Sequence, residues 1–218
     1  MGIFITFEGT EGGGKSTQVQ LLAERLRAQG RLVRVLREPG GTPIGEEIRH
    51  TLKHSQVNQA MTSETELLLM NASRAQLVRE VIGPSLAAGE MVLCDRFFDS
   101  TVAYQGYGRG LDLARVQAII DFAVGGIRPN LTLLLEVPLE VSEQRRRARE
   151  AAWRSESGGS APMRDRMEEA DRSFFERVHH GFAAIAEADP RRVRRINAVA
   201  SVEEVSALVW KTVAPLVA

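Results

Sequence analysis

The amino-acid sequence predicts an α/β fold in which a parallel sheet of about five strands is flanked by helices. Two observations carry this prediction. Short apolar runs rich in β-branched and aromatic residues recur along the chain, and longer amphipathic stretches separate them. Because these stretches reach about ten residues or more, each is expected to join two parallel strands as the crossover of a βαβ unit. The length of 218 residues suits one medium-sized domain with a large core.

The clearest of the expected strands are short apolar runs of the kind that is buried inside a parallel sheet. The first of them, IFITF, combines β-branched and aromatic side chains. The predicted strands cover residues 3–7, 31–38, 91–95, 131–137 and 192–197.

The expected helices carry apolar residues at intervals of three and four positions. Ser63 and Glu66 have the spacing of a capping box at the start of the longest helix, and Pro138 is expected to start another. A Gly/Ser-rich stretch at 155–162 is interpreted as a mobile loop between two helices. No internal repeat or linker is visible, so residues 1–218 are expected to form a single domain. The predicted helices cover residues 16–29, 44–52, 63–88, 114–124, 138–150, 165–188 and 202–213.

The composition argues against several classes of protein. Lys and Arg together number 28, as do Asp and Glu, so the net charge is zero and no nucleic-acid or anionic-membrane partner is expected. The single cysteine, Cys94, argues against a disulfide framework and a cysteine-rich metal site. The sequence has no apolar run of about 18 residues and no basic leader ahead of the first strand. A cytoplasmic protein is therefore expected.

Residues 9–16, GTEGGGKS, match the phosphate-loop pattern G-x-x-x-x-G-K-[ST], between a predicted strand and a predicted helix. Such a loop turns its backbone N–H groups toward phosphate oxygens, and glycines keep side chains out of that approach. Lys15 is expected to reach the β- and γ-phosphates of a nucleoside triphosphate, and the Ser16 hydroxyl to ligate Mg²⁺. The predicted triphosphate-binding residues are Gly9, Thr10, Glu11, Gly12, Gly13, Gly14, Lys15, Ser16 and Thr17.

A second phosphate-handling site is expected at the carboxyl ends of the second and third strands, where parallel-sheet proteins bind ligands. Asp95 ends the third strand, and a carboxylate there can bind Mg²⁺ directly or through water. Arg96 follows with a guanidinium suited to a phosphate, and Arg37 places another cation at the end of the second strand. The bond between Glu38 and Pro39 is a candidate for a cis peptide. These residues alone leave a kinase, a switch GTPase and a motor ATPase open.

Five stretches occur in the order found in one enzyme family. They are FEGTEGGGKST (7–17), REPGGT (37–42), SRAQLV (73–78), DRFFDSTVAYQG (95–106) and RPNLTLLLEV (128–137). Over nearly its whole length the chain resembles the thymidylate kinases, and REPGGT together with DRFFDSTVAYQG is the most specific part of that resemblance. It implies a P-loop nucleoside monophosphate kinase-like fold with a lid, transfer of the γ-phosphoryl group of ATP to dTMP with Mg²⁺, and commonly a homodimer.

The resemblance also implies roles for single residues. Arg37 and Arg96 match arginines that bind the acceptor phosphate, and Arg74 matches the arginine that contacts the thymine edge. Met70 stands where the family usually has an aromatic residue that stacks on the base. Methionine packs against a ring face but lacks a flat stacking surface. The residues implied to bind dTMP are Glu11, Arg37, Met70, Arg74, Arg96, Ser100, Thr101, Tyr104 and Gln105.

The remaining catalytic charge is expected from a lid. Some family members carry an arginine in the phosphate loop at the position of Gly12, so here that charge must come from elsewhere. Arginine-rich stretches on both sides of the Gly/Ser loop match the lid of the bacterial type, at about 150–167. Arg149 and Arg166 are the predicted lid arginines, and with Lys15 and Arg96 they form the predicted catalytic set. Lid closure would exclude water, so that ATP is not hydrolysed instead of transferred.

Two other interpretations stay open on the residues alone. A kinase for another acceptor, such as dUMP, dCMP or a nucleoside, would share the phosphate loop and the Asp95–Arg96 pair. Glu38 would then stand where a nucleoside kinase places a catalytic carboxylate. A nucleotide switch or a partner-binding ATPase is disfavoured, because the sequence has no guanine-reading N-K-x-D motif and carries several arginines at the acceptor site.

Overall fold

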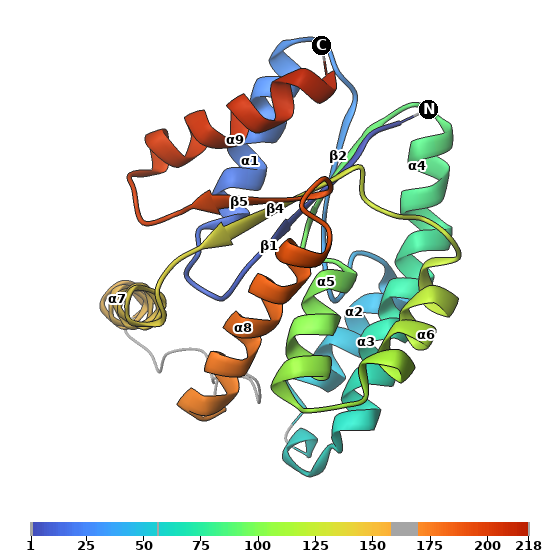
Figure 1. Ribbon diagram of the computed structural model, residues 1–218, viewed down its shortest axis with the longest axis vertical. Helices are drawn as coiled ribbons and strands as arrows, with labels where there is room; N and C mark the ends of the chain where they lie inside the picture. The colour runs from blue at the N-terminus through green and yellow to red at the C-terminus, as the bar shows by residue number, and fades with distance from the viewer. Residues whose placement is uncertain (1, 56, 158–169, 218) are drawn as a thin grey trace.

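The computed structural model describes residues 2–55, 57–157 and 170–217. The strands of this described part form a five-stranded sheet in the order β2-β3-β1-β4-β5, and every neighbouring pair is parallel (Figure 1). The predicted five-stranded parallel sheet is therefore confirmed. The strands are β1 (Phe4–Glu8), β2 (Val33–Arg37), β3 (Met91–Asp95), β4 (Leu131–Glu136) and β5 (Val193–Asn197).

Side chains alternate between the two faces of the sheet, so each central strand contributes to two cores. In β1, Ile5 and Phe7 pack into one apolar cluster, while Phe4 packs into another. The same alternation separates Leu93 from Val92 in β3. Burial on both faces explains why these strands are continuous apolar runs in the sequence.

Two helices from opposite ends of the chain cover one face of the sheet (Figure 1). Leu22 of the first and Val209 of the second are buried in the cluster that contains Ile5 and Phe7. The predicted final helix, 202–213, continues to residue 217 and includes Pro215. The two helices are α1 (Lys15–Ala28) and α9 (Val202–Val217).

The opposite face is covered by α8 and by helices from the middle of the chain, and α2 packs on α3 rather than on the sheet (Figure 1). Ile82, Phe97 and Ile120 are fully buried in the cluster that these helices form with the sheet. The helices are α2 (Pro43–Lys53), α3 (Ser63–Leu77), α4 (Gly83–Ala87), α5 (Phe98–Thr101), α6 (Leu113–Val124) and α8 (Arg172–Ala188), with a 3-10 helix η1 (Asn58–Ala60) and π-helical segments η2 (Val78–Ile82) and η3 (Val102–Gly108).

Helix α7 (Leu139–Ser157) follows β4 and is seen end-on at the side of the molecule in Figure 1. It is longer than the predicted helix 138–150. The predicted Gly/Ser loop, 155–162, begins inside it, since residues 155–157 are helical. The rest of that loop, and most of the predicted lid at 150–167, lie outside the described residues.

Helix α8 begins later than the predicted start at residue 165. Asp171 caps it, because its side chain accepts a hydrogen bond from Phe174 N at 2.7 Å. The described helix therefore starts at Arg172. Residues 165–169 lie outside the described part of the chain.

The predicted capping box of Ser63 and Glu66 is wrong. Thr62 is the N-cap of α3, and its side chain accepts a hydrogen bond from Thr65 N at 3.2 Å. Glu66 is buried and binds other partners in the site. The predicted long helix at 63–88 is helical to residue 87, as the succession α3, η2 and α4.

The sequence predicts no helix directly after β3, but α5 and η3 fill residues 98–108. Polar and aromatic side chains of this stretch, among them Thr101, Tyr104 and Gln105, are buried. The stretch therefore lacks the amphipathic pattern by which a helix is recognised in a sequence, and only its motif is recognisable.

Across the described ranges, none of the helices combines the length and the apolar character that a membrane crossing requires.

Candidate active site

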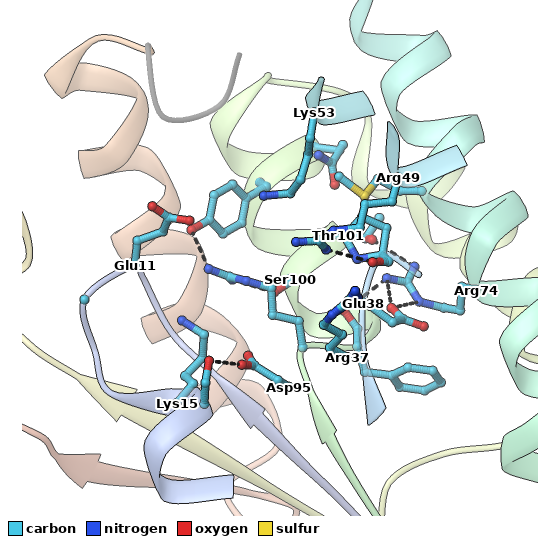
Figure 2. A pocket seen from close by; sticks show the side chains of 18 of the residues that line it. Glu11, Lys15, Arg37, Glu38, Arg49, Lys53, Arg74, Asp95, Ser100 and Thr101 are labelled. Atoms are coloured by element: carbon cyan, nitrogen blue, oxygen red, sulfur yellow. Dashed lines mark hydrogen bonds and ion pairs between the residues drawn. The ribbon is translucent and has the colours of Figure 1, made fainter. Parts of the chain in front are cut away.

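A cavity of about 590 Å³ lies at the carboxyl ends of β1, β2 and β3, the edge at which parallel sheets bind ligands (Figure 2). Figure 2 shows Lys15 and Asp95 on one side of it, with Arg49 and Lys53 reaching in from α2. Most of the predicted site residues meet here. Those that line the cavity are Glu11, Gly12, Gly14, Lys15, Ser16, Thr17, Arg37, Met70, Arg74, Asp95, Arg96, Ser100, Thr101, Tyr104 and Gln105.

Lys15, the first residue of α1, lies inside the phosphate loop. Its Nζ donates hydrogen bonds to the carbonyl oxygens of Gly9 at 3.1 Å and Thr10 at 2.8 Å. The side chain is buried. Burial, followed by the charge of the nearby Arg96 guanidinium, lowers the pKa of Lys15 to about 7. A phosphate beside the amine would favour its charged form again.

Two glycines of the loop are required by the elements packed behind it. Gly9 has a φ of 127°, and a Cβ there would lie 2.3 Å from the carbonyl oxygen of Leu135 in β4. Gly12 has a φ of 74°, and its Cβ would lie 2.9 Å from the carbonyl oxygen of Ser142 in α7. Ser142 Oγ also donates a hydrogen bond to Glu11 O at 2.5 Å. The loop is thus packed between the sheet and α7.

Ser16 and Asp95 form a pair of hard oxygen ligands next to the phosphate loop. Ser16 Oγ donates a hydrogen bond to Asp95 Oδ2 at 2.6 Å. Within residues 2–55, 57–157 and 170–217, no group of three or more His, Cys, Asp or Glu is arranged to bind a metal ion. Mg²⁺ is commonly bound by one or two carboxylates together with substrate phosphates and water. The donor set of Ser16 and Asp95 therefore fits the predicted Mg²⁺ site.

Arg96 follows β3 with a φ of 71°, in the left-handed region. Its Nη1 donates a hydrogen bond to Ser100 Oγ at 3.0 Å, and its Nη2 donates to the Tyr104 hydroxyl at 3.4 Å. Ser100 Oγ donates in turn to Glu8 Oε2 at 2.5 Å. Glu8 is fully buried. Sequence reasoning missed it, although a charged residue at the end of an apolar strand was the available signal.

Arg74 is buried beside the cavity and makes several hydrogen bonds. Its Nε donates to Glu38 Oε2 at 2.8 Å, and its Nη1 donates to Asn71 Oδ1 and Thr101 Oγ1, both at 2.9 Å. Its Nη2 donates to Phe97 O at 3.1 Å. Burial raises the pKa of Glu38, and the charge of Arg74 opposes that rise. The guanidinium is therefore fixed in one orientation.

Gln105 is oriented by a buried carboxylate on α3. Its Nε2 donates a hydrogen bond to Glu66 Oε1 at 2.8 Å, and Arg109 Nη2 lies 2.9 Å from Glu66 Oε2. Met70 lies one helical turn before Arg74 on the same helix, lines the cavity and is 8% exposed. Helix α3 thus contributes both a cation and an apolar surface to the cavity.

Sequence reasoning also missed two cations of α2, Arg49 and Lys53, which line the cavity (Figure 2). Their spacing of four residues was the available signal, although the predicted helix 44–52 contains Arg49 and ends one residue before Lys53. Arg37 lines the cavity at the end of β2, where its half-exposed guanidinium pairs with Glu46 at 3.0 Å. The Glu38–Pro39 peptide between Arg37 and α2 is cis, so this expectation is confirmed.

Arg145 of α7 also lines the cavity; it belongs to the arginine-rich stretch that the sequence assigns to the lid, but it was not among the chosen site residues. Its Nη1 donates hydrogen bonds to Gly12 O at 3.2 Å and Ala198 O at 2.9 Å, and its Nη2 donates to Val199 O at 3.2 Å. Arg145 thereby connects the phosphate loop with the segment that follows β5. Its guanidinium therefore lies beside the phosphate loop.

Neither of the two predicted lid arginines has a side chain within the described part of the chain. The backbone of Arg149 belongs to α7, but its side chain is outside the described part, as is the whole of Arg166. Gly9, Thr10 and Gly13 stand in the loop without lining the cavity. The carbonyl groups of Gly9 and Thr10 bind Lys15 instead.

A phosphate loop that faces a second group of cations across one cavity is the arrangement of a phosphotransferase with two phosphate-bearing ligands. Together with the β2-β3-β1-β4-β5 sheet, it places the chain among the phosphate-loop kinases.

The comparisons with known proteins agree with this class. A family model described as thymidylate kinase matches residues 7–209. A thymidylate kinase of Synechococcus sp. (strain JA-2-3B'a(2-13)) is 46% identical over 213 residues, which cover 98% of this chain and 95% of the relative. A thymidylate kinase of Pseudomonas fluorescens (strain Pf0-1) is 50% identical over 197 residues, 90% of this chain and 88% of the relative.

A solved structure adds the same likeness in three dimensions. The crystal structure of thymidylate kinase from Ehrlichia chaffeensis has a TM-score of 0.74 and 32% sequence identity, over 97% of this chain and 98% of that chain. The chain belongs to the thymidylate kinase family. The predicted P-loop nucleoside monophosphate kinase-like fold and the predicted activity, phosphorylation of dTMP to dTDP, are confirmed at the level of this family.

Proposed function

We propose that the cavity binds ATP and dTMP together and that the γ-phosphoryl group passes between them by in-line transfer with Mg²⁺. One observation carries this proposal: residues of the phosphate loop and residues of the acceptor motif line the same cavity. Arg96 connects the two sides, because it donates a hydrogen bond to Tyr104 and its charge acts on Lys15.

On the donor side, backbone N–H groups of residues 9–17 would bind the triphosphate of ATP. Lys15 would contact the β- and γ-phosphate oxygens. Ser16 would ligate Mg²⁺, with Asp95 bound to it directly or through water. When bound, the ion would neutralise charge on the transferred phosphoryl group. The 2.6 Å contact between Ser16 Oγ and Asp95 Oδ2 supports this assignment.

The acceptor phosphate is assigned to a group of cations. Arg37 and Arg96 are the residues that the sequence motif identifies, and Arg49 and Lys53 face the same space from α2 (Figure 2). Guanidinium groups suit this role because they can bind two phosphate oxygens at once. Lys15 and Arg96 would then act on the reacting phosphates as catalytic residues.

The nucleoside of dTMP is assigned to the part of the cavity between α3 and the α5–η3 segment. Arg74 would contact the thymine edge, and its four partners support a fixed orientation for this contact. Met70 would pack against the face of the base. The residues that would line the base and deoxyribose are Glu11, Ser100, Thr101, Tyr104 and Gln105.

Three further parts of the proposal rest on the family resemblance. Residues 1–218 form a single kinase domain, residues at about 150–167 form a lid, and Arg149 and Arg166 supply its catalytic charge. The protein is a homodimer. Exposed apolar side chains on the neighbouring helices α3 and α6, Leu68 and Phe122, are compatible with such an interface.

A coupled ADP-release assay with Mg-ATP tests the function. The acceptors would be dTMP, dUMP, dCMP, UMP, AMP, GMP and thymidine, with one reaction lacking any acceptor. We expect strong turnover with dTMP, weaker turnover with dUMP and little without an acceptor. Turnover led by another acceptor would mean that the pocket around Met70 selects a different base. ADP release that ignores the acceptor would contradict the kinase assignment.

A further inference from the structure

Glu8, the last residue of β1, has a buried carboxylate to which the proposed function gives no role. Its Oε1 accepts hydrogen bonds from the backbone nitrogens of Phe97 at 2.7 Å and Ser100 at 3.3 Å. Its Oε2 accepts from Ser100 Oγ at 2.5 Å. A carboxylate of the central strand therefore binds the start of α5, the segment that carries the acceptor motif.

The Glu8 carboxylate determines which group donates and which accepts in these hydrogen bonds. An ionised carboxylate only accepts, so Oε2 receives the single hydroxyl proton of Ser100. The Ser100 oxygen then offers a lone pair to Arg96 Nη1, 3.0 Å away, and a guanidinium only donates. The hydrogen bonds run in one direction, from Arg96 to Ser100 to Glu8.

The backbone around Arg96 needs such support. In the part of the chain that the structure describes, Arg96 is the one non-glycine residue in the left-handed region. This conformation is disfavoured for a residue with a Cβ, so surrounding contacts must stabilise it. β1 supplies them on both sides: Arg96 N donates to Phe7 O at 2.9 Å, and Phe97 N donates to Glu8.

We propose that Glu8 is a positioning residue of the acceptor site: its carboxylate orients the Ser100 hydroxyl and thereby directs Arg96 toward the acceptor phosphate. This inference rests on the proposed function, in which Arg96 binds that phosphate. Burial and the neighbouring charge of Asp99 raise the pKa of Glu8 to about 7, and the Arg96 guanidinium opposes the rise by favouring the carboxylate.

Glu8→Gln tests the proposal with almost no change in shape. The glutamine amide has one accepting oxygen and one donating NH₂ group. Whichever way it is oriented, its NH₂ group faces either the Ser100 hydroxyl or the backbone N–H groups of Phe97 and Ser100, which the carboxylate oxygens of Glu8 accept from in the wild type. We expect the Kd for dTMP, measured by calorimetry, to rise about 10-fold or more, as for loss of a charge-assisted hydrogen bond. We expect kcat to fall as well. The Kd for ATP, measured without dTMP, should change much less, because the charge of Glu8 affects the pKa of Lys15 less than the charges of Asp95 and Glu11 do.

Asp99→Asn is the matched control. Asp99 belongs to α5, the short helix that also contains Ser100, and its side chain is buried, as that of Glu8 is. It accepts hydrogen bonds from Arg192 Nη1 at 2.6 Å and Nη2 at 2.9 Å. Asp99 is not among the residues that line the cavity. Loss of its charge should lower the free energy of unfolding without weakening dTMP binding, because the charge of Asp99 raises the pKa of Glu8 and its removal favours the Glu8 carboxylate.

Wild-type dTMP affinity and kcat in Glu8→Gln would overturn the proposal. Equal losses of ATP and dTMP affinity would also overturn it, because they would indicate general damage to the end of β1, which continues into the phosphate loop. If Glu8→Gln does not fold, Ser100→Ala replaces it, and wild-type dTMP affinity in that variant would overturn the proposal.

A double-mutant cycle separates the role of the hydroxyl. In a Ser100→Ala background, Glu8→Gln should change the Kd for dTMP less than it does in the wild type. If Glu8→Gln changes the Kd for dTMP as much in the Ser100→Ala background as in the wild type, the proposed connection through Ser100 is wrong.

A wild-type enzyme that does not phosphorylate dTMP would overturn the proposed function. Wild-type turnover with an unaffected Glu8→Gln variant would overturn the role of Glu8 alone.

Discussion

Among single residues, Lys15 shows how burial sets the charge state of the phosphate loop. Its side chain is 7% exposed and its Nζ donates to two carbonyl oxygens. Burial lowers its pKa to about 7, with the nearby Arg96 guanidinium as the next cause. The triphosphate of ATP would surround the amine with negative charge and raise its pKa again. Above pH 7, ATP binding should therefore draw a proton from solution.

We predict that ATP binding at pH 8 takes up roughly one proton, because a group with a pKa of about 7 is mostly uncharged there. ATP affinity should accordingly fall as the pH rises above 7. Calorimetry in two buffers with different ionisation enthalpies measures the uptake. Lys15→Arg is the control, since a guanidinium stays charged in this range. Undiminished uptake in that variant would assign the proton to another group, such as Glu8.

The candidate site could be predicted from the sequence where its chemistry belongs to a local motif. Lys15 and Ser16 are recognisable because the loop that positions them is continuous in the chain. Glu8 belongs to no such local motif: its one signal is a charge at the end of an apolar strand, and it meets Ser100 across 92 positions. Arg49 likewise reaches the cavity only after α2 has packed against α3. Residues whose role depends on tertiary contacts are therefore the ones that were missed.

Among the elements, α3 contributes Met70 and Arg74 to the proposed nucleoside site, and its Glu66 orients Gln105. Its first turn depends on Thr62, whose side chain accepts a hydrogen bond from Thr65 N. The sequence offers two neighbouring hydroxyls for this role, Thr62 and Ser63. A difference in stability between their alanine variants can identify the cap.

We predict that Thr62→Ala lowers the free energy of unfolding by about 1 kcal/mol, the usual effect of losing an N-cap hydroxyl. Ser63→Ala, as the matched control, should have a much smaller effect, because the Ser63 hydroxyl does not cap α3. Urea unfolding of the two variants and the wild type measures both values. A larger loss in Ser63→Ala would contradict the assigned cap.

The strands could be predicted more accurately than the helix ends. A strand buried on both faces, such as β3, must be an apolar run, so its pattern is visible in the sequence. Helix ends depend on single side chains: α8, which Asp171 caps, begins seven residues after the predicted start at 165, and Thr62 precedes the predicted cap of α3. The stretch at 98–108 was missed as a helix because its buried residues include polar ones such as Gln105.

In the whole molecule, the cavity depends on segments that are far apart in the chain. The phosphate loop follows β1, the acceptor motif follows β3, and Arg145 comes from α7. α7 also leads into residues 150–167, the proposed lid. Since Gly12 brings no cation to the phosphate loop, the charge that stabilises the transferred group is proposed to come from that direction.

We predict that Arg149→Ala and Arg166→Ala each lower kcat by at least about 100-fold, as expected for loss of a cation at the transferred phosphoryl group. The Kd for dTMP should change little. Arg147→Ala is the control on the same helix, because its guanidinium is exposed and lies 3.8 Å from Glu143. Steady-state kinetics and calorimetry measure both quantities. Full kcat in both lid variants would rule out the lid assignment.

The close packing of Gly12 against α7 restricts how this chain can change by mutation. A side chain at position 12 would place its Cβ 2.9 Å from a backbone oxygen of α7, in a conformation with a φ of 74° that favours glycine. Backbone atoms cannot move aside as a flexible side chain can. An arginine in the loop would therefore require the loop or the backbone of α7 to shift. In a lineage that starts from this chain, we expect a change in the packing of α7 to accompany an arginine at position 12, so that a single substitution would carry a cost in stability.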